Sequence, residues 1–274
     1  MSERLRRRLI VTADDFGLHP AVNDAVVQAC QQGVLRAASL MVSAPAAADA
    51  ASRARGLPGL AVGLHLVLAD GQPMLPPEQI PALVDDQGRF SCDMLRNGVR
   101  FFFLPHVRRQ LAAEIRAQFE AFAATGLRLD HVNAHKHFHL HPTILSLVID
   151  TGRAFGLRAV RVPADPQTPV WLRPWLDLMR WRLKKASLLC NDQVFGLHHT
   201  GGMDEQVLLE ILRHLPDGLS EIYLHPATRN QLTPAMAGYR HTDELAALLS
   251  PQVREFISAH HYLCQGFCDP AAAA

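Results

Sequence analysis

The sequence predicts an α/β fold, an irregular TIM-like (β/α) barrel of roughly seven strands. Short apolar runs typical of buried parallel strands alternate with longer segments whose apolar residues recur every three or four positions. The strand–helix units number roughly seven, which suits a closed barrel better than an open sheet. The chain has 274 residues, of which 49% are hydrophobic, so it can bury one large core. We therefore expect a single domain over residues 1–270.

The N-terminal part of the chain contains three of the expected strands, the apolar runs 9–12, 38–42 and 60–66. The expected helices between them are 20–32, which has Gly33 past its end, and the alanine-rich segment 45–55. Residues 70–98 are rich in Pro, Gly and Asp and show little periodicity. We expect them to form a long excursion over one end of the sheet.

The rest of the chain continues the alternation. Apolar residues from Val107 to Phe122 recur at helical spacing and predict a helix over 105–126. Further helices are expected at 142–155, 204–215, 242–250 and 251–258, and further strands at 127–133, 159–163 and 221–226. In such barrels the side chains that perform chemistry lie at the carboxyl ends of the strands.

Composition excludes some classes of function. The formal net charge of +1 offers no electrostatic footprint for nucleic acid. The five cysteines are scattered and odd in number, which is typical of reduced thiols in the cytosol. The basic N-terminus is followed by too short an apolar run for a signal peptide, and no apolar stretch reaches the ~18 residues of a membrane span. We expect a cytoplasmic protein, free in solution or bound peripherally at the inner membrane.

Paired carboxylates follow the first expected strand. Asp14 and Asp15 come directly after the run 9–12, and Phe16-Gly17 follows them. A solvated turn or a helix N-cap would be the ordinary explanation of an Asp pair. Here the buried strand before them favours function. Since adjacent side chains point in different directions, one carboxylate can bind a metal while the other faces the water that it activates.

Histidines follow two other expected strands. His65 lies in an apolar strand, and alone it would be a hydrogen-bonded core residue. The stretch 131–141 carries His at every odd position except Asn133, which is an improbable use of a titratable side chain for packing. We expect the chain to leave the strand at His135, with Pro142 opening the next helix. A loose surface metal-binding tract is the alternative for this stretch.

One carboxylate and two neutral imidazoles from three strand ends can hold a divalent metal and leave positions open for water and substrate. His225 ends a later strand and titrates in the right range to protonate a leaving group. The roles of the remaining histidines of the stretch, His131, His137, His139 and His141, stay open.

These motifs together resemble the YdjC-like carbohydrate deacetylases, over about residues 9–268. The resemblance rests on Ala13-Asp14-Asp15-Phe16-Gly17, Gly63-Leu64-His65, His131 to His137 and His225-Pro226-Ala227. It implies an irregular barrel related to that of the polysaccharide deacetylases. It also implies Asp15, His65 and His135 as metal ligands, Asp14 as catalytic base and His225 as general acid. Asn133 departs from the pattern, since the family often has Asp there, and this concerns the tuning of the metal rather than its ligands.

A narrower resemblance is to the hopanoid-biosynthesis (HpnK-type) branch of that family. It rests on the runs 37–42, 101–105, 131–142 and 159–163. The branch implies removal of the N-acetyl group from an N-acetylglucosaminyl hopanoid, a sugar-headed lipid, to leave a glucosaminyl hopanoid.

A basic aromatic segment fits a lipid substrate independently. All three tryptophans, Trp171, Trp175 and Trp181, lie within 171–185, interleaved with Leu, Met, Arg and Lys. Such a helix can lie in a membrane interface. A barrel helix that faces the core and carries snorkelling basic residues is an equal alternative. The run 101–104 would add a second apolar lip.

The sequence therefore predicts a metal-dependent N-deacetylase. The rivals are a deacetylase of soluble chito-oligosaccharides or other N-acetylated sugars, and a non-catalytic metal- or sugar-binding protein. Asp14 argues against the last, because pure binding needs no base. The expected cofactor is one divalent metal ion, Zn, Mg or another transition metal. The expected partner is the lipid substrate, with no nucleic acid. The oligomeric state stays open, a homodimer included.

Overall fold

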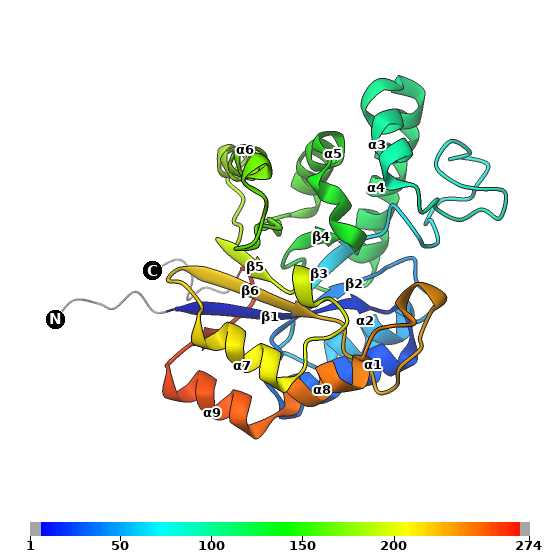
Figure 1. Ribbon diagram of the computed structural model, residues 1–274. Coiled ribbons are helices and arrows are strands. Elements are labelled where there is room, and N and C mark those ends of the chain that lie inside the picture. Colours follow the sequence, from blue (N-terminus) through cyan, green and yellow to red (C-terminus); the bar gives the residue numbers. More distant parts are fainter. Residues whose placement is uncertain (1–6, 269–274) are drawn as a thin grey trace.

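The computed structural model describes residues 7–268, and in it the strands form one curled parallel sheet (Figure 1). The expected domain of residues 1–270 extends past this range at both ends. The path of the sheet is β4-β3-β2-β1-β6-β5, and β7 pairs with the start of β1. The strands are β1 (Arg8–Phe16), β2 (Ala37–Leu40), β3 (Ala61–Leu66), β4 (Val132–Ala134), β5 (Gln193–Phe195), β6 (Leu219–Leu224) and β7 (Leu263–Cys264). This arrangement confirms the α/β class.

Residues 159–164 join the two edges of the sheet. Val160 forms a parallel bridge with Val132 of β4, and Ala159 bridges Leu189. Farther on, the Val194 amide of β5 donates to the Ala164 carbonyl at 3.0 Å. The sheet is thereby curled into an irregular barrel, although the strand expected over 159–163 is reduced to isolated bridges. The Asn191 side chain takes over part of the ladder, since it accepts from the Val162 amide and donates to its carbonyl.

Helices cover both sides of the sheet (Figure 1). Those from the two ends of the chain lie on one side: α1 (Pro20–Gln32), α2 (Ala47–Arg55), α7 (Glu205–Arg213), α8 (His241–Leu249) and α9 (Pro251–Ala259). Those from the middle lie on the other: α3 (Met94–Phe103), α4 (Pro105–Ala124), α5 (Pro142–Gly152) and α6 (Arg173–Lys185). Their apolar faces bury Leu, Val, Ile and Phe in one continuous core.

Two local expectations were wrong in extent. The excursion over 70–98 ends early, because α3 begins at Met94, where the Asp93 side chain accepts from the Arg96 amide and caps the helix. The strand expected over 127–133 is shortened at its start, because β4 begins only at Val132, and a 3₁₀ helix follows it over His135–Leu140. Within the described residues, no helix is both long and apolar enough to cross a membrane.

The register of the sheet brings the functional residues to one end. His65 pairs with Asn133 across β3 and β4, and Ala13 pairs with Leu224 across β1 and β6. Since all these strands are parallel, their carboxyl ends meet at one end of the barrel.

Candidate metal centre

The end of β1 is distorted in a way that separates the two carboxylates. Its register with β2 shifts between Ala13 and Phe16, and Asp15 lies in the left-handed region with φ of 60°. A non-glycine residue with positive φ is strained, and Asp is among the residues that tolerate it best. The bulge lets Asp14 and Asp15 reach different partners although they are neighbours in the chain.

Asp15 lies against two imidazoles. Its Oδ1 is 3.2 Å from His65 Nε2 and 3.3 Å from His135 Nδ1. One ligand atom from each of these three residues lies within 4.8 Å of the others. Both oxygens of Asp15 are buried without a hydrogen-bond partner, which is costly unless another group satisfies them. A carboxylate and two imidazoles with unsatisfied buried oxygens fit a divalent metal ion, and the set does not specify which one.

The charge state of Asp15 agrees with this fit. Burial opposes ionisation, but the His135 and His65 imidazoles outweigh it and hold the pKa of Asp15 well below its usual range. The carboxylate is therefore ionised at neutral pH, as a metal ligand must be.

Asn133 fixes the orientation of His65. The side-chain oxygen of Asn133 lies 2.7 Å from His65 Nδ1, so Nδ1 carries the proton and Nε2 is left to face Asp15. The Asn133 amide nitrogen donates to Asp14 Oδ1 at 3.0 Å and to Ser39 Oγ at 2.9 Å. The residue that departs from the family pattern thus lies directly behind the candidate ligand His65 and the proposed base Asp14.

Sequence reasoning missed Arg161. Its guanidinium is fully buried and donates to both oxygens of Asp14, at 2.6 and 3.0 Å, and to both oxygens of Glu221, at 2.6 and 2.9 Å. Thr12 Oγ1 donates to Glu221 at 2.7 Å. Burial alone would raise the pKa of Asp14, but Arg161 outweighs it and lowers that pKa below its usual range. A single Arg within the apolar run 159–163 was the available signal.

A chain of hydrogen bonds runs from Asn133 through Ser39 and His131 to Asp130. Asp130 Oδ2 is 3.0 Å from His131 Nδ1, and His131 Nε2 is 3.0 Å from Ser39 Oγ. All three are buried. A Cβ on Gly63 would lie 2.5 Å from the His131 ring, so glycine is needed there for His131 to fit. His131 is thus a structural residue, separated from the ligand His65 by Ser39 and Asn133.

The other histidines of the stretch have separate partners. As expected, the chain leaves the strand at His135, and positive φ angles of 54° at Lys136 and His137 turn it. His137 Nε2 is 3.1 Å from Tyr223 Oη, and His139 Nε2 donates to the Arg161 carbonyl at 2.9 Å. His141 caps α5 by accepting from the Thr143 amide. This distribution is unlike a loose surface tract.

His225 follows β6 and faces the same centre. Its Nε2 lies 4.0 Å from Asp15 Oδ2, and its ring makes edge contacts with Tyr223 and Tyr239. Burial lowers the pKa of His225, although Asp15 and Asp14 work in the opposite direction. Its backbone amide donates to the Glu244 carboxylate, which also accepts from the Met203 amide at 3.2 Å. Glu244 therefore ties the segment after β6 to the loop before α7.

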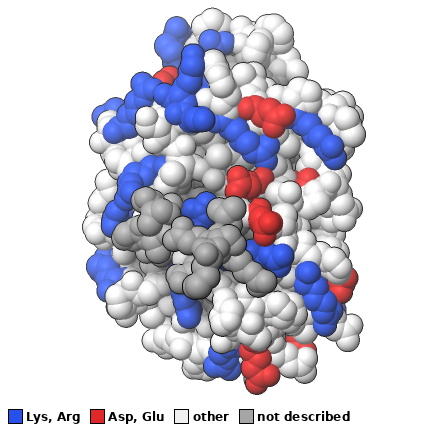
Figure 2. All heavy atoms as spheres, turned by 90° about the vertical axis from the view of Figure 1, so that its left-hand side faces the viewer, with Lys and Arg blue, Asp and Glu red and all other residues white. Residues whose placement is uncertain are grey.

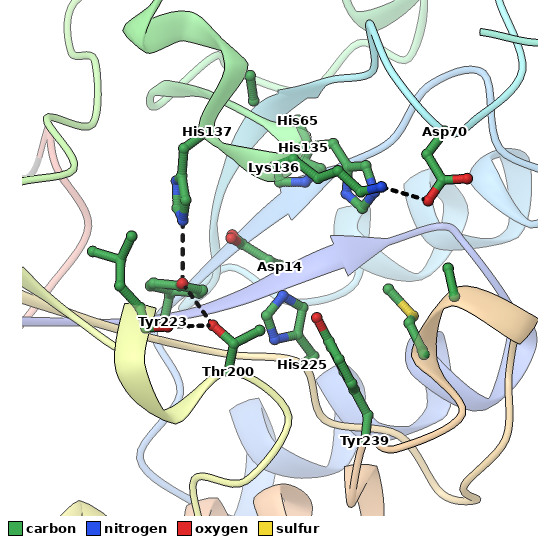
Figure 3. A pocket seen from close by; sticks show the side chains of 14 residues that line it. Asp14, His65, Asp70, His135, Lys136, His137, Thr200, Tyr223, His225 and Tyr239 are labelled. Carbon is green, nitrogen blue, oxygen red and sulfur yellow. Dashed lines mark hydrogen bonds and ion pairs between the residues drawn. The ribbon is translucent and has the colours of Figure 1, made fainter. Parts of the chain in front are cut away.

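A pocket of about 250 Å³ opens over these residues (Figure 3). Asp14, His65, His135 and His225 line it, and Figure 3 shows their side chains around one space. Sequence reasoning also missed Tyr223, whose hydroxyl lies between His137 and Thr200, at 3.1 Å from each. The structure thus brings all five proposed site residues together, since Asp15 lies directly behind the pocket in contact with His65 and His135.

The chain matches the YdjC-like protein family over residues 8–259. It belongs to this family. A relative from Brevibacillus brevis named carbohydrate deacetylase is 33% identical over 255 residues, which cover 91% of this chain and 94% of the relative. A chitooligosaccharide deacetylase from Escherichia fergusonii is 33% identical over 161 residues, covering 58% of this chain and 60% of the relative.

A solved structure is also similar over nearly the full length. It is that of a putative cellobiose-phosphate cleavage protein from Enterococcus faecalis, with a TM-score of 0.78 and 25% identity. The match covers 96% of this chain and 98% of the other. The family match and this structural similarity each extend over almost the whole of the described chain.

Proposed function

We propose that this protein is a metal-dependent carbohydrate N-deacetylase. The observation that carries the proposal is the convergence of Asp15, His65 and His135 beside Asp14 in one pocket. The full-length relatives named carbohydrate deacetylases support the reaction class. A protein that only bound metal or sugar would not need a second buried carboxylate aimed at the same space.

In this proposal, Asp15, His65 and His135 hold a divalent metal ion, which when bound lowers the pKa of water and polarises a carbonyl. Asp14 accepts a proton from the attacking water. Arg161 and Asn133 keep Asp14 ionised and fix its direction. His225, on the other side of Asp15, donates a proton to the departing amine nitrogen, so the sugar leaves as an amine and the acetyl group as acetate.

Acetate release tests this proposal. Purified protein, stripped and reloaded with Zn²⁺, Mg²⁺, Mn²⁺, Co²⁺ or Ni²⁺ in turn, is incubated with methyl N-acetylglucosaminide and with chito-oligosaccharides. We expect metal-dependent acetate and a free amine in equal amounts. Absence of both products with every metal and every substrate would refute the reaction.

The role of His225 needs a separate substrate. His225→Ala should slow cleavage of the acetamide more than cleavage of an activated aryl acetate, whose leaving group needs no proton. Equal losses on the two substrates would show that His225 positions the substrate rather than protonating the leaving group.

For the substrate we propose an N-acetylglucosaminyl hopanoid, deacetylated at the cytoplasmic face of the inner membrane. The motif resemblance supports this, and so does the surface. The exposed large apolar side chains of the described residues fall in two segments, 95–104 on α3 and 170–189 around α6. In the second segment Trp171 is 78% exposed and Trp181 is 52% exposed. Helices α3 and α6 stand on the same side of the sheet (Figure 1).

The charge of this surface favours an anionic membrane. Helix α6 carries five basic residues, Arg173, Arg180, Arg182, Lys184 and Lys185, against the single Asp177. Figure 2 shows basic side chains gathered on the upper part of the face that includes α6. Apolar and basic residues together are typical of interfacial helices. Trp175 takes no part in the proposed contact, because it is half-buried and its indole N–H donates to the Leu140 carbonyl at 2.9 Å.

In this proposal the two alternatives for α6, a membrane contact and a core-facing helix, apply to different faces. Leu176, Met179 and Leu183 are buried and face the core, while Trp171, Leu178 and Trp181 are exposed.

Deacetylation of soluble chito-oligosaccharides is the second candidate function, and the Escherichia fergusonii relative favours it. Mass spectrometry of both substrate types after incubation with equal enzyme decides which one turns over faster.

A further inference from the structure

A second cavity, of about 660 Å³, adjoins the metal pocket. Four residues line both spaces: Asp70, His135, Ala235 and Met236. Because His135 is one of the three candidate ligands, a molecule with its acetamide at the metal pocket can extend into this cavity. Its size falls within the roughly 300–1,000 Å³ of ordinary small-molecule sites, whereas the metal pocket alone is smaller.

The walls of the cavity come from segments without an assigned role. The β1–α1 turn supplies Leu18, the segment between β2 and α2 supplies Met41 and Ala44, and the long excursion supplies Phe90. The loop 232–236 closes the remaining side. Neither the excursion nor this loop contributes a residue to the chemistry proposed above. Lining the cavity would give both segments a role in substrate binding.

About half of the residues that line the cavity carry aliphatic side chains, Met and Pro included. Several polar groups of the lining already have protein partners. Asp70 accepts from Lys136 Nζ at 2.7 Å, and Asp85 accepts from the Gln87 and Arg89 amides at 2.9 and 3.0 Å. His19 Nδ1 accepts from the Ala21 amide. Leu18, Pro20, Ala44, Pro45 and Leu232, none of which is buried, are left as contact surface.

The aromatic content argues against a further sugar subsite. Sugars are bound through hydrogen bonds to their hydroxyls and by packing on aromatic faces. Among the described lining residues, Phe90 is the one Phe, Tyr or Trp, and it is only 4% exposed, so it offers no open ring face. An aliphatic group gains free energy in such a cavity, about 0.8 kcal/mol for each methylene removed from water.

We infer that this cavity binds an aliphatic aglycone on the reducing side of the acetamido sugar. The inference rests on the proposed deacetylase function and adds a specificity site to it. The enzyme then selects an N-acetylated glycoside by its apolar tail as well as by its sugar, and loop 232–236 lies where the two parts of the substrate join.

Three substrates of one sugar test the inference. They are methyl and octyl N-acetyl-β-glucosaminide, the octyl compound kept below its micelle concentration, and diacetylchitobiose. We expect the metal-loaded enzyme to show a kcat/KM at least tenfold higher for octyl than for methyl. Chitobiose should resemble methyl. Equal values for octyl and methyl, or a larger gain for chitobiose than for octyl, would overturn the aliphatic assignment.

Two variants locate the effect. Ala44→Phe fills the cavity, and Leu232→Glu places a charge in it. Both should remove most of the octyl advantage and leave the methyl value within twofold. The matched controls are Ala48→Phe and Gln231→Glu, which add the same groups at exposed positions outside the lining. Parallel losses on methyl and octyl, or the same losses in the controls, would contradict the inference.

A binding measurement separates this inference from the proposed function. Octyl β-glucosaminide is titrated by calorimetry into metal-free protein, with methyl glucosaminide as reference. Octyl binding that is weakened at least tenfold by Leu232→Glu but not by Gln231→Glu supports the cavity even if no substrate is deacetylated. Active enzyme that binds both compounds equally refutes the cavity and leaves the deacetylase standing.

Discussion

In most proteins charged side chains lie outside and large apolar side chains inside. The metal centre breaks the first half of this rule, and the surface formed by the exposed apolar residues of α3 and α6 breaks the second. At the centre, ionised side chains such as Asp14, Asp15 and Arg161 are almost wholly buried. On the surface, large apolar side chains such as Phe103 and Trp171 are exposed, at 68% and 78%. Buried charge and exposed apolar area both cost stability, so each marks a region kept for a purpose other than folding.

The two regions differ in how they compensate for that cost. At the centre every charge has a nearby partner, except that the Asp15 oxygens lack a hydrogen bond. On the surface the described partners are few, and the clearest is Lys185, whose Nζ lies 4.2 Å from the centre of the Trp181 ring. A paired network should therefore break as a unit, whereas exposed side chains should be removable one by one.

The largest effect is expected at the candidate ligands. Asp15→Ala, His65→Ala and His135→Ala should each abolish detectable deacetylation, because each removes one of three ligands. Elemental analysis after dialysis should show that bound metal falls with activity. If two of the three variants kept full occupancy, the ligand assignment would be wrong.

Asp14→Asn separates catalysis from metal binding. The amide keeps the shape of the carboxylate but cannot accept a proton, so turnover should fall roughly 10²–10⁴-fold. Metal content should stay at the level of the unchanged protein. Near-normal turnover with metal bound would move the base to another residue, and His137 would be tested next.

Arg161→Met tests the buried network as a structural unit. It leaves Asp14 and Glu221 buried without their cation, and breaking such pairs costs about 3–5 kcal/mol. Chemical denaturation should show this loss of unfolding free energy. The triple change of Arg161, Asp14 and Glu221 to Met, Asn and Gln should recover part of it. A triple variant as unstable as the sum of the separate single changes would show that the charges are not coupled.

The exposed surface should behave in the opposite way. Changing Phe103, Trp171 and Trp181 to Ser should alter stability little, about 0.5 kcal/mol or less at each position, because these side chains already face water. Binding to vesicles with anionic lipid should drop at least tenfold in a sedimentation assay. Val207→Ser, at a partly exposed apolar position of α7 on the opposite side of the sheet, serves as the control. Unchanged vesicle binding would exclude this surface as the membrane contact.

The smallest effect concerns Glu244. Burial raises the pKa of Glu244 to about 7, against 4.5 as the ordinary value. The folded state thus binds this proton more tightly, and the stabilisation is complete below about pH 4.5 and is lost as the pH rises through about 7. Gln cannot lose a proton, so the Glu244→Gln variant should not lose this stabilisation at high pH. The Tm of the variant minus the Tm of the unchanged protein should therefore be larger at pH 8 than at pH 5. A Tm difference that is the same at both pH values would contradict the raised pKa.

The parts of the site that sequence could predict are those with a short-range pattern. Asp14 and Asp15 follow an apolar strand, and His65 stands alone in another, so each can be recognised from its neighbours in the chain. Arg161 and Glu221 cannot be recognised in this way. Arg161 lies 147 residues from Asp14 and 60 residues from Glu221 in the sequence. Only the curl of the sheet brings the three together.

The fold shows the same division. Alternating apolar runs predicted β1, β2, β3, β4, β6 and most helices, whereas the short strands β5 and β7 were not predicted. Helix α3 was missed because the excursion rich in Pro, Gly and Asp was extended to Gly98, which lies inside the helix, although Leu95, Val99 and Phe103 recur there at helical spacing. The strand at 159–163 was overextended because the Asn191 side chain, rather than a neighbouring strand, satisfies the Val162 backbone.

Asn133 has a consequence for any attempt to redesign this protein. One amide group holds the proton-bearing nitrogen of His65, an oxygen of Asp14 and the hydroxyl of Ser39. A substitution chosen to change the preferred metal would also turn the proposed base, and a substitution chosen to adjust the base would turn a ligand. Metal preference and the orientation of the base thus depend on the same side chain. Variants selected for a new metal should therefore need a compensating change at Ser39 or His131 before activity returns.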